Sequence, residues 1–346
     1  VLWGYSLAFG EGGPFIGNFD FLGFKDVASE SDEGIPPMLF AIFQMMFAII
    51  TPALITGAIA ERFKFTTYLI FLVAWVTFVY APIAHWVWAS DGWLFELGAL
   101  DFAGGTVVHI NAGVAAVAAA WLVGKRRGVD RGVEPHNVPF VILGASILWF
   151  GWFGFNAGSG LAADGLAVSA FLVTNTAAAT ALVVWLILGH IHTGKMSAVG
   201  AATGAVAGLV AIPPAAGFVG PMGSIAIGLG AGVLTFYAVR IRHKFGFDDA
   251  LEVMAVHGIG GIWGALATGI FAVGGIGLID GDAKVLGYNA VAVLSTIAYS
   301  FVVTFVILKI LDVIPGLGLR ADDAAEDAGL DVSLHGERAY VGDGAD

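Results

Sequence analysis

The sequence contains no cysteine and little charge. Without cysteine, the protein cannot form disulfides, use a thiolate nucleophile or hold a metal or iron–sulfur cluster through cysteine. Charged residues make up 12% and hydrophobic residues 58% of the 346 residues. Because soluble domains carry roughly 25% charged residues, this composition excludes a soluble globular protein.

Basic residues are scarcer than acidic ones. The chain has 15 Lys and Arg against 27 Asp and Glu, which gives a formal net charge of -12. Six of the acidic residues lie in residues 1–37 and eight lie in residues 321–346. The excess acidity therefore belongs to segments that face water, and it argues against nucleic acid as a partner.

Apolar stretches of about twenty residues recur along the whole chain. At about 1.5 Å per residue, each stretch can cross a hydrocarbon layer of about 30 Å as a helix. The stretches are too long for the strands of a membrane β-barrel and do not alternate as such strands do. We predict an all-α polytopic membrane protein with nine spans, at residues 38–60, 66–88, 104–124, 138–158, 166–189, 196–218, 223–241, 254–276 and 288–311.

The Lys and Arg residues fall on alternate loops, which sets the expected orientation. With nine spans, 13 of the 15 basic residues lie on one side of the membrane, and only Lys25 and Lys284 lie on the other. The positive-inside rule then places the C-terminal tail in the cytoplasm and residues 11–37 outside. The thirteen are Arg62, Lys64, Lys125, Arg126, Arg127, Arg131, Lys195, Arg240, Arg242, Lys244, Lys309, Arg320 and Arg338.

Residues 1–10, VLWGYSLAFG, are apolar and aromatic but too short to span a bilayer or to serve as a signal peptide. They do not begin with Met. We expect them to be the outer end of a span that starts before this segment, so that at least one further helix precedes it.

Two of the eight histidines, His109 and His257, lie inside apolar stretches, and each follows an acidic residue by eight positions. Eight helical residues rise about 12 Å, which takes each imidazole from the interface to near the bilayer centre. Asp101 is expected outside and Asp249 inside, so the two histidines approach the midplane from opposite faces. This pattern indicates inverted repeats with a substrate path between them. The matching residues are Val108, His109 and Gly113 in one unit and Val256, His257 and Gly261 in the other.

Each histidine could instead have a purely structural role and form a hydrogen bond between two helices. Ionisable groups in membranes are costly, however, and usually face a cavity or a pathway. Desolvation favours the neutral imidazole, which has one donor and one acceptor nitrogen and can therefore bind a small polar solute. A cation would need aromatic faces such as those of Phe47 and Trp88, worth about 1–2 kcal/mol. Trp88 could equally belong to an interfacial aromatic belt.

The segment DFAGGTVVHINAG at 101–113 resembles the signature of the ammonium transporter family, the Amt/Mep/Rh proteins, in its prokaryotic Amt-like form. Similar blocks follow along essentially the whole chain. They are GAIAERFKF at 57–65, PIAHWVW at 82–88, GWFGFNAGS at 151–159, GAVAGLVAIPPAAGFVGP at 204–221, DDALEVMAVHGIGGIWG at 248–264 and GLDVSLHGERAY at 329–340.

The resemblance implies an eleven-helix fold with inverted five-helix repeats and one extra C-terminal helix, assembled as a homotrimer with one pore per subunit. On that pattern the chain lacks the first helix and most of the second, which leaves about nine full spans. Residues 1–311 would form the transmembrane domain and residues 312–346 a cytoplasmic regulatory tail. The block after Gly329 resembles the segment that contacts the cytoplasmic pore openings and responds to PII-type (GlnK-like) proteins.

The resemblance also implies an outer ammonium site. Trp88 and Phe47 resemble its aromatic members, and Phe47 with Phe171 resembles the stacked pair that closes the outer pore. The family usually has a hydroxyl residue as a third member of this site. Counting four residues on from Phe171 gives Asn175, which departs from that pattern.

Within the lumen, His109 and His257 resemble the family's twin histidines, and Asp101 resembles the acid that organises the outer vestibule and the start of its helix. The implied function is a channel-type transporter in the cell membrane. It would recruit NH4+, deprotonate it and conduct NH3 with the proton relayed; passage of methylammonium is left open. The resemblance implies no enzymatic activity, catalytic residue, metal or cofactor.

Two other functions are weighed against transport. A metalloenzyme could use both histidines as ligands, but metal sites usually need three or four protein ligands, and no third His or carboxylate lies in the middle of a span. A sensor of the same fold would report ammonium through a partner or an attached domain. The short tail, residues 312–346, leads us to expect transport.

Overall fold

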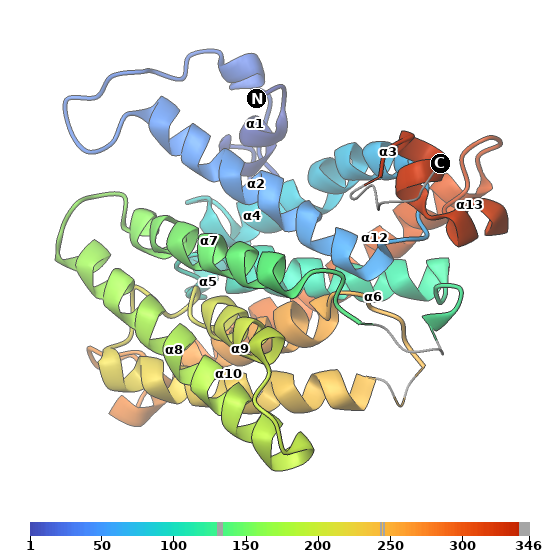
Figure 1. The fold of residues 1–346 in the computed structure, drawn as a ribbon. Helices are drawn as coiled ribbons and strands as arrows, with labels where there is room; N and C mark the ends of the chain where they lie inside the picture. Colours follow the sequence, from blue (N-terminus) through green and yellow to red (C-terminus); the bar gives the residue numbers. More distant parts are fainter. Residues whose placement is uncertain (130–133, 243, 245, 339–346) are drawn as a thin grey trace.

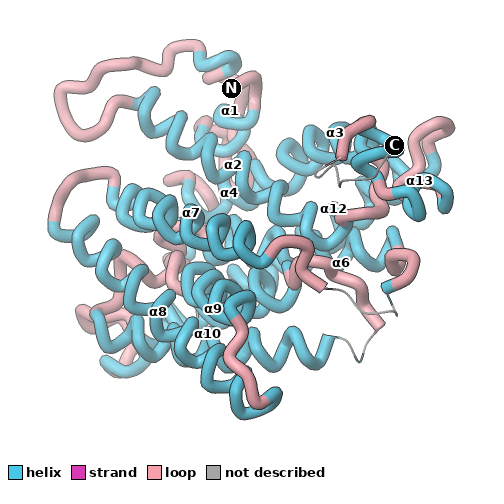
Figure 2. The backbone as a smooth tube through the Cα atoms, viewed as in Figure 1, coloured by secondary structure: helices cyan, strands magenta, loops and turns pink. Residues whose placement is uncertain are grey.

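The computed structural model describes residues 1–129, 134–242, 244 and 246–338, which are helical nearly throughout (Figures 1 and 2). Arg131 and the end of the tail after residue 338 lie outside the described residues. The described part contains no strand, only an isolated bridge between Phe63 and Arg320. The prediction of an all-α membrane protein is confirmed.

Ten apolar helices form the body of the described structure. They are α2 (Pro37–Ile59), α3 (Phe65–Trp75), α4 (Ala81–Trp88), α6 (Asn111–Val123), α7 (Val138–Ala157), α8 (Gly165–Thr193), α9 (Ala198–Ala211), α10 (Pro221–Arg242), α11 (Gly260–Phe271) and α12 (Lys284–Val313). Short helices are α1 (Gly4–Phe9), α5 (Trp93–Leu97) and α13 (Asp323–Ala328), with 3-10 turns at Leu22–Phe24, Gly158–Gly160 (η5) and Leu278–Asp280. Wider π-helical turns are η2 (Val76–Tyr80), η3 (Gly105–Ile110), η7 (Met254–Ile259) and η9 (Asp331–His335).

Polar side chains set several helix starts. Asn137 accepts a hydrogen bond from the backbone N–H of Phe140 at the start of α7, and Asp164 and Ser197 cap α8 and α9 in the same way. Such caps satisfy backbone donors that have no partner inside the helix. They explain why these helices begin within a residue or two of the predicted positions.

Eight helical stretches in the described part are long and apolar enough to cross a membrane. Eight of the nine predicted spans correspond to them. The ninth prediction, 196–218, is wrong in its end: the helix α9 covers Ala198–Ala211, and the chain continues from there without a helix to Pro221. Proline has no backbone N–H and disfavours the helical conformation in the residue before it, so Pro213 and Pro214 end the helix. Their carbonyl groups accept hydrogen bonds from the backbone N–H groups of Ala103 and Phe102.

Two interrupted helices form the centre of the molecule. Of the apolar segment in Gly105–Val123, 83% is buried inside the protein. The buried share is 61% in Met254–Phe271 and only 6% in Val138–Gly160. Each central stretch begins with a π-helical turn that contains a histidine, η3 with His109 and η7 with His257. The two predicted repeat units therefore meet in the core, while helices such as α7 lie at the surface.

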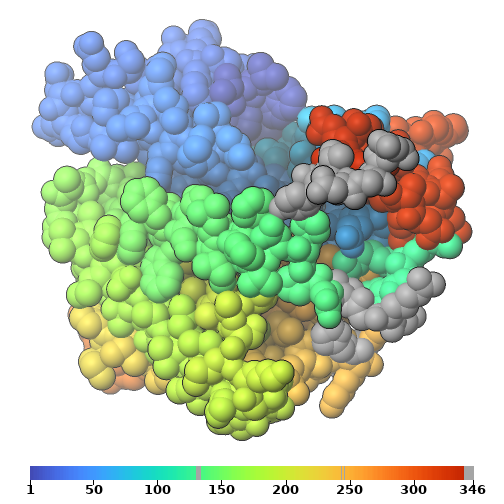
Figure 3. All heavy atoms as spheres, in the orientation of Figure 1, coloured from blue at the N-terminus to red at the C-terminus, as the bar shows by residue number. Residues whose placement is uncertain are grey.

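The basic loops gather at one end of the bundle together with the tail. The segment after α2 pairs with the tail, since the backbone N–H of Lys64 donates to Leu319 and that of Ala321 donates to Arg62. Figure 3 shows the C-terminal residues (red) as a patch beside the helical bundle. The segments after α2 and α6, the segment before η7 and the tail therefore lie on a common side.

Candidate functional site

A cavity of about 150 Å³ lies at the end of the bundle opposite the basic loops. It is formed where α1, α2 and α4 approach the turn after α7, and most of its walls are aromatic. The lining residues are Phe9, Phe40, Phe43, Gln44, Phe47, Trp88, Phe102, Ser159 and Leu161.

Trp88 and Phe47 lie together in this cavity, which we call the outer cavity. Their ring centroids are 5.4 Å apart with the rings nearly perpendicular. The indole N–H of Trp88 donates to the backbone carbonyl of Asp101 at 2.8 Å. Because its N–H is engaged outside the cavity, the indole ring is held in one orientation.

The predicted pair of Phe47 and Phe171 is not formed. Phe171 lies on α8 with 48% of its surface exposed, and it stacks on Phe153 with the ring centroids 3.8 Å apart. Asn175, one turn further along α8, is also exposed and does not line the outer cavity. Phe171 and Asn175 therefore do not belong to the cavity that contains Phe47 and Trp88.

Phe155 and Ser159 lie where Phe171 and Asn175 were expected. The Phe155 ring packs on Phe47 with the centroids 4.6 Å apart, and Ser159 lines the cavity. The two residues are also four positions apart, and they stand in the block 151–159 that resembles the family. A hydroxyl residue four positions after a phenylalanine, sought inside the block 151–159, identifies this pair in the sequence.

His109 and His257 are in contact in the core. Their Nδ1 atoms are 3.2 Å apart, and the side chains are buried. The His109 ring is stacked against Trp152 and Phe155, with centroid distances of 5.5 Å and 5.9 Å. A continuous series of rings therefore leads from Phe47 through Phe155 to the two histidines.

Glycines four residues after each histidine allow this contact. A Cβ atom on Gly113 would lie 2.3 Å from the backbone nitrogen of Gly258, and one on Gly261 would lie 3.0 Å from the Cβ of His109. Small residues let membrane helices approach closely. Gly113 and Gly261, the matching glycines of the two predicted repeat units, therefore lie where these two segments cross.

Asp101 binds the backbone at the start of the first central helix. One carboxylate oxygen accepts from the backbone N–H groups of Gly104 and Gly105, at 2.7 Å and 2.6 Å. The other oxygen accepts from the N–H and the hydroxyl group of Thr106. A carboxylate at this position satisfies the free donors of the helix start and matches its positive end.

Asp249 is the counterpart of Asp101 at the start of the second central helix. Its carboxylate accepts from the backbone N–H of Met254 at 2.7 Å. Burial raises the pKa of Asp249, although this hydrogen bond and the nearby Arg242 oppose the effect. The acidic residue eight positions before each histidine thus has the same structural role in both segments. Each carboxylate binds the start of a helix whose histidine reaches the core.

A second, larger cavity of about 1170 Å³ lies at the basic end of the bundle. Its lining includes His257 together with Glu61, Arg126, Asp248 and Glu252. His257 therefore lines the inner cavity, while Phe47 lines the outer one. The rings of Phe155 and His109 fill the space between them.

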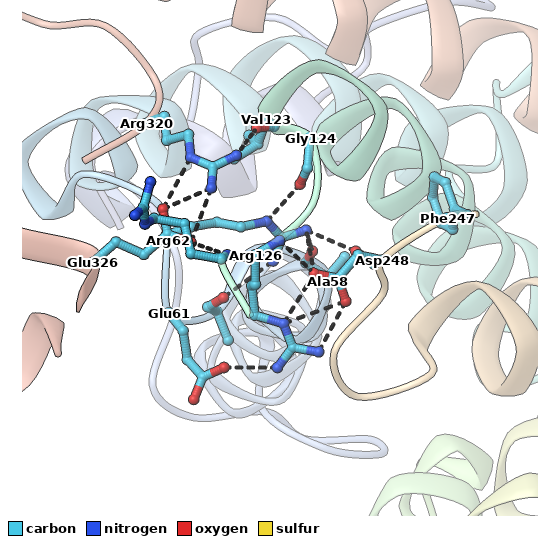
Figure 4. A network of polar contacts seen from close by, with 12 residues as sticks. Ala58, Glu61, Arg62, Val123, Gly124, Arg126, Phe247, Asp248, Arg320 and Glu326 are labelled. Atoms are coloured by element: carbon cyan, nitrogen blue, oxygen red, sulfur yellow. Dashed lines mark hydrogen bonds and ion pairs between the residues drawn. The ribbon is translucent and has the colours of Figure 1, made fainter. Parts of the chain in front are cut away.

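Figure 4 shows a network of polar contacts around Arg62, Arg126 and Arg320, of which Arg126 lines the inner cavity. Arg62 is fully buried and donates to the backbone carbonyls of Ala58, Gly124 and Asp248, at 2.7–2.8 Å. Since helix C-termini leave carbonyl groups unpaired, Arg62 completes the ends of α2 and α6 at once.

Arg126 connects this network to the cavity wall. It binds Asp248 through two nitrogens and Glu61 through a third, at 2.7–2.9 Å. Burial alone would raise the pKa of Asp248, but the hydrogen bonds from Arg126 and the nearby charge of Arg62 outweigh it and hold that pKa below its ordinary value. Asp248 is therefore a carboxylate in the folded protein.

The tail is held by ion pairs next to this network. Glu326 of α13 binds Arg320 and accepts from the backbone N–H of Arg127. The Arg127 side chain pairs with Asp323 and Asp327. Arg126 lines the inner cavity, and the next residue, Arg127, binds the tail. The cavity wall and the tail are therefore connected through adjacent residues.

Comparison with known proteins identifies similar chains over nearly the full length. The model of the Ammonium Transporter Family matches residues 1–340. The ammonium transporter of Bacillus subtilis is 48% identical over 98% of this chain and 86% of its own length. Ammonium transporter Amt1 of Archaeoglobus fulgidus is 47% identical over 99% of this chain and 86% of its own.

Solved structures agree with the sequence comparison. Mep2 of Saccharomyces cerevisiae superposes with a TM-score of 0.88 at 38% identity, over 93% of this chain and 78% of that chain. A structure titled Sensor Amt Protein superposes with a TM-score of 0.86 at 36% identity, over 96% and 84% of the two chains.

Proposed function

This chain belongs to the ammonium transporter family, and on that premise we propose that it recruits NH4+ in the outer cavity, removes a proton near the ring stack and passes NH3 along His109 and His257 to the inner cavity. The observation that carries the proposal is the contact between the two histidines, at the point where rings fill the space between two cavities.

The outer cavity has the chemistry to hold ammonium. A cation over the faces of Trp88 and Phe47 would gain about 1–2 kcal/mol when partly desolvated. Two oxygens can accept its N–H groups. The Ser159 hydroxyl donates to the carbonyl of Phe155, which leaves its lone pairs free, and Gln44 Oε1 is buried without a hydrogen-bond partner in the described structure. Potassium has no N–H group and would not gain these hydrogen bonds.

The rings below the cavity favour a neutral solute. Moving a bare cation from water into an apolar passage is costly, while ammonia needs only a few hydrogen bonds. Phe47 and Phe155 offer no polar atom that could replace the hydration shell of a cation. Ammonium would therefore transfer one proton to solvent water in the outer cavity, and neutral ammonia would pass the rings.

The histidine pair provides hydrogen bonds for ammonia beyond the rings. A contact between two Nδ1 atoms holds one shared proton, so one ring donates and the other accepts. The donating ring then has an acceptor at Nε2, and the accepting ring has a donor at Nε2. His109 Nε2 has no partner among the described residues, which leaves it available. The pair can thus accept a hydrogen bond from ammonia and donate one to it, and can relay a proton by exchanging tautomers.

We place this machinery in residues 1–311, with residues 312–346 as a regulatory tail in the cytoplasm. The protein would lie in the cell membrane as a homotrimer surrounded by lipid. The inner cavity and the docked tail lie at the same end of the bundle, which supports contact with a PII-type (GlnK-like) regulator at that face.

Transport is favoured over sensing. The curated relatives that are 43–48% identical are named as ammonium transporters, whereas the structure titled as a sensor is 36% identical. An ammonium-dependent current would separate the two functions, because a sensor needs only binding.

The test is the current from proteoliposomes on a solid-supported membrane, with ammonium and with potassium. We expect a current with ammonium and none with potassium. Replacing both histidines, His109→Ala and His257→Ala, should abolish the ammonium current or admit potassium. The matched control is Asn175→Ala, which lies outside the outer cavity and should behave as the wild type. An unchanged ammonium current and unchanged exclusion of potassium in the histidine variant would contradict the proposal.

A further inference from the structure

A bulky residue with a left-handed backbone conformation lines the outer cavity. Leu161 follows the 3-10 turn η5 at the end of α7, and its φ is 57°. It lines the cavity together with Ser159, two residues earlier. Because 36% of its surface is exposed, Leu161 lies at the rim of the cavity.

The backbone conformation at this position favours glycine. Helices often end with one residue in the left-handed region, and that residue is usually glycine, because a Cβ atom is strained there. Gly160 directly precedes Leu161, yet the left-handed residue is the leucine. The backbone therefore gives no reason for leucine here, and the reason has to lie in what its side chain does.

Other strained residues of this kind gather at the two cavities. Among the described residues, five that are not glycine have a positive φ, and they are Phe24, Asp26, Glu61, Leu161 and Glu252. Glu61 and Glu252 line the inner cavity, while Leu161 lines the outer one. Strained backbone conformations cluster at binding and active sites in proteins. This distribution indicates a functional reason for the leucine.

The turn that carries Leu161 is fixed on both sides. An added Cβ on Gly158 would lie 3.1 Å from the ring of Phe43, so the backbone of the turn rests on the aromatic wall of the cavity. The backbone N–H of Leu161 donates to the carbonyl of Gly158 at 3.0 Å. On the other side, Asp164 caps the start of α8. Leu161 is thus held in place close to Ser159.

The lining of the outer cavity separates hydrogen bonding from space. Ammonium and methylammonium both offer N–H groups to Ser159 and Gln44, so these acceptors discriminate little between them. An apolar wall accepts a methyl group wherever there is room for it. Discrimination between the two cations therefore depends on the space beside the acceptors. Among the described lining residues, Leu161 is the aliphatic one, and the other apolar ones are aromatic.

We propose that Leu161 is a specificity-determining residue of the outer ammonium site. Its side chain occupies the space beside Ser159 that the methyl group of methylammonium requires. The left-handed backbone holds the side chain there, and the fixed turn prevents it from moving away. This inference rests on the function proposed for the outer cavity and deepens it, since the site then prefers unsubstituted ammonium over alkylated ammonium ions.

The first test compares the KM values for ammonium and methylammonium in proteoliposome currents. Leu161→Ala should lower the ratio of the methylammonium KM to the ammonium KM by about tenfold, because room for one methylene changes discrimination by about 10–200-fold. The maximal current with ammonium should stay close to that of the wild type.

Two further variants serve as controls. Leu161→Met keeps an apolar side chain of similar volume and should retain the wild-type ratio. Leu166→Ala removes a leucine of similar exposure, 40%, that does not line the outer cavity, and it should also match the wild type. A ratio that is unchanged in Leu161→Ala would overturn the proposal. That is the result expected if Leu161 only makes an apolar contact that ends α7.

The second test measures binding without transport. A ligand that binds the folded protein raises its unfolding temperature, which would be measured in detergent with ammonium, methylammonium or sodium chloride at equal ionic strength. Leu161→Ala should increase the shift caused by methylammonium more than the shift caused by ammonium. Shifts equal to those of the wild type would overturn the proposal. Failure of the transport function would appear differently, as the absence of a saturable ammonium current in the wild type.

Discussion

Single hydrogen bonds and ring contacts define the outer cavity at the scale of the residue. The Ser159 hydroxyl donates its proton to the carbonyl of Phe155. Its oxygen can therefore only accept a hydrogen bond from a solute in the cavity. Trp88 is fixed in a comparable way through Asp101. The side chains that would meet the substrate are thus oriented by backbone carbonyls nearby.

Replacing the hydroxyl tests this arrangement. Ser159→Ala should raise the KM for ammonium by about tenfold, because a hydrogen bond to a charged group contributes about 1.5 kcal/mol. The maximal current should change little. Concentration series of the proteoliposome current give both quantities, and Ser146→Ala, an exposed hydroxyl on α7 that donates to a backbone carbonyl, is the control. A wild-type KM in Ser159→Ala would remove this residue from the site.

The sequence located most of the site but misplaced one pair. Phe47, Trp88, His109 and His257 follow from motifs and from the depth of each residue in its span. Phe155 with Ser159 and Phe171 with Asn175 have the same four-residue spacing, and both pairs stand near the outer end of an apolar helix. Spacing alone does not tell which helix faces the cavity; the stacking of Phe171 on Phe153 at the surface decides it.

At the scale of the element, the two central helices depend on glycine for their crossing. An added Cβ on Gly113 would lie 2.4 Å from the Cα of Gly258, and that atom is backbone, which cannot move aside. The histidines are in contact only because these segments approach so closely.

Gly113→Ala should therefore destabilise the protein by about 1–3 kcal/mol, the usual cost of overpacking. It should also weaken or abolish the ammonium current, since the histidines are forced apart. Thermal unfolding in detergent measures the first effect. Gly287→Ala on α12, where an added Cβ meets nothing within 4 Å, is the matched control and should unfold at or above the wild-type temperature.

Helix boundaries were predicted well where they depend on local residues and poorly elsewhere. Capping residues and charges mark the starts of α7, α8 and α9 in the sequence. The end of α9 at Ala211 was missed because hydropathy continues beyond it, although Pro213 and Pro214 mark the break. The π-helical turns that bring His109 and His257 together have no clear signature, since they depend on packing against the other repeat unit.

At the scale of the whole molecule, ion pairs and hydrogen bonds of arginines connect the segments at the inner end. The loops after α2 and α6, the loop before η7 and the tail all meet around Arg62, Arg126 and Arg320 (Figure 4). These segments are far apart in the chain, so their polar contacts hold the helices in a common arrangement.

Removing one charge from this network should have a large effect. Asp248→Asn leaves Arg126 and the buried Arg62 without their carboxylate, and breaking such a buried pair costs on the order of 3 kcal/mol. Thermal unfolding at neutral pH measures the loss. Asp26→Asn removes an exposed carboxylate paired with Lys25 and should change stability by less than about 1 kcal/mol. Equal effects of the two substitutions would contradict the role of the network.

The same pair predicts how stability depends on acid. Because folding lowers the pKa of Asp248 below its ordinary value of 3.8, the stabilisation is fully present above that value and is lost as pH falls through the lowered pKa. Unfolding temperatures measured from pH 6 down to pH 3 should fall more steeply in the wild type than in Asp248→Asn. Parallel curves would show that Asp248 is not the group responsible.

The two cavities also determine where an electric field acts. If each cavity fills with electrolyte, the membrane potential falls mainly across the layer of rings between Phe47 and His257, and hardly across the vestibules. A charge that crosses the whole potential gains about 2.3 kcal/mol per 100 mV, so a proton relayed through the histidine pair would experience nearly all of it within a few ångströms. The rate of uptake through such a relay would rise steeply with hyperpolarisation. The passage of uncharged ammonia alone would not depend on the membrane potential.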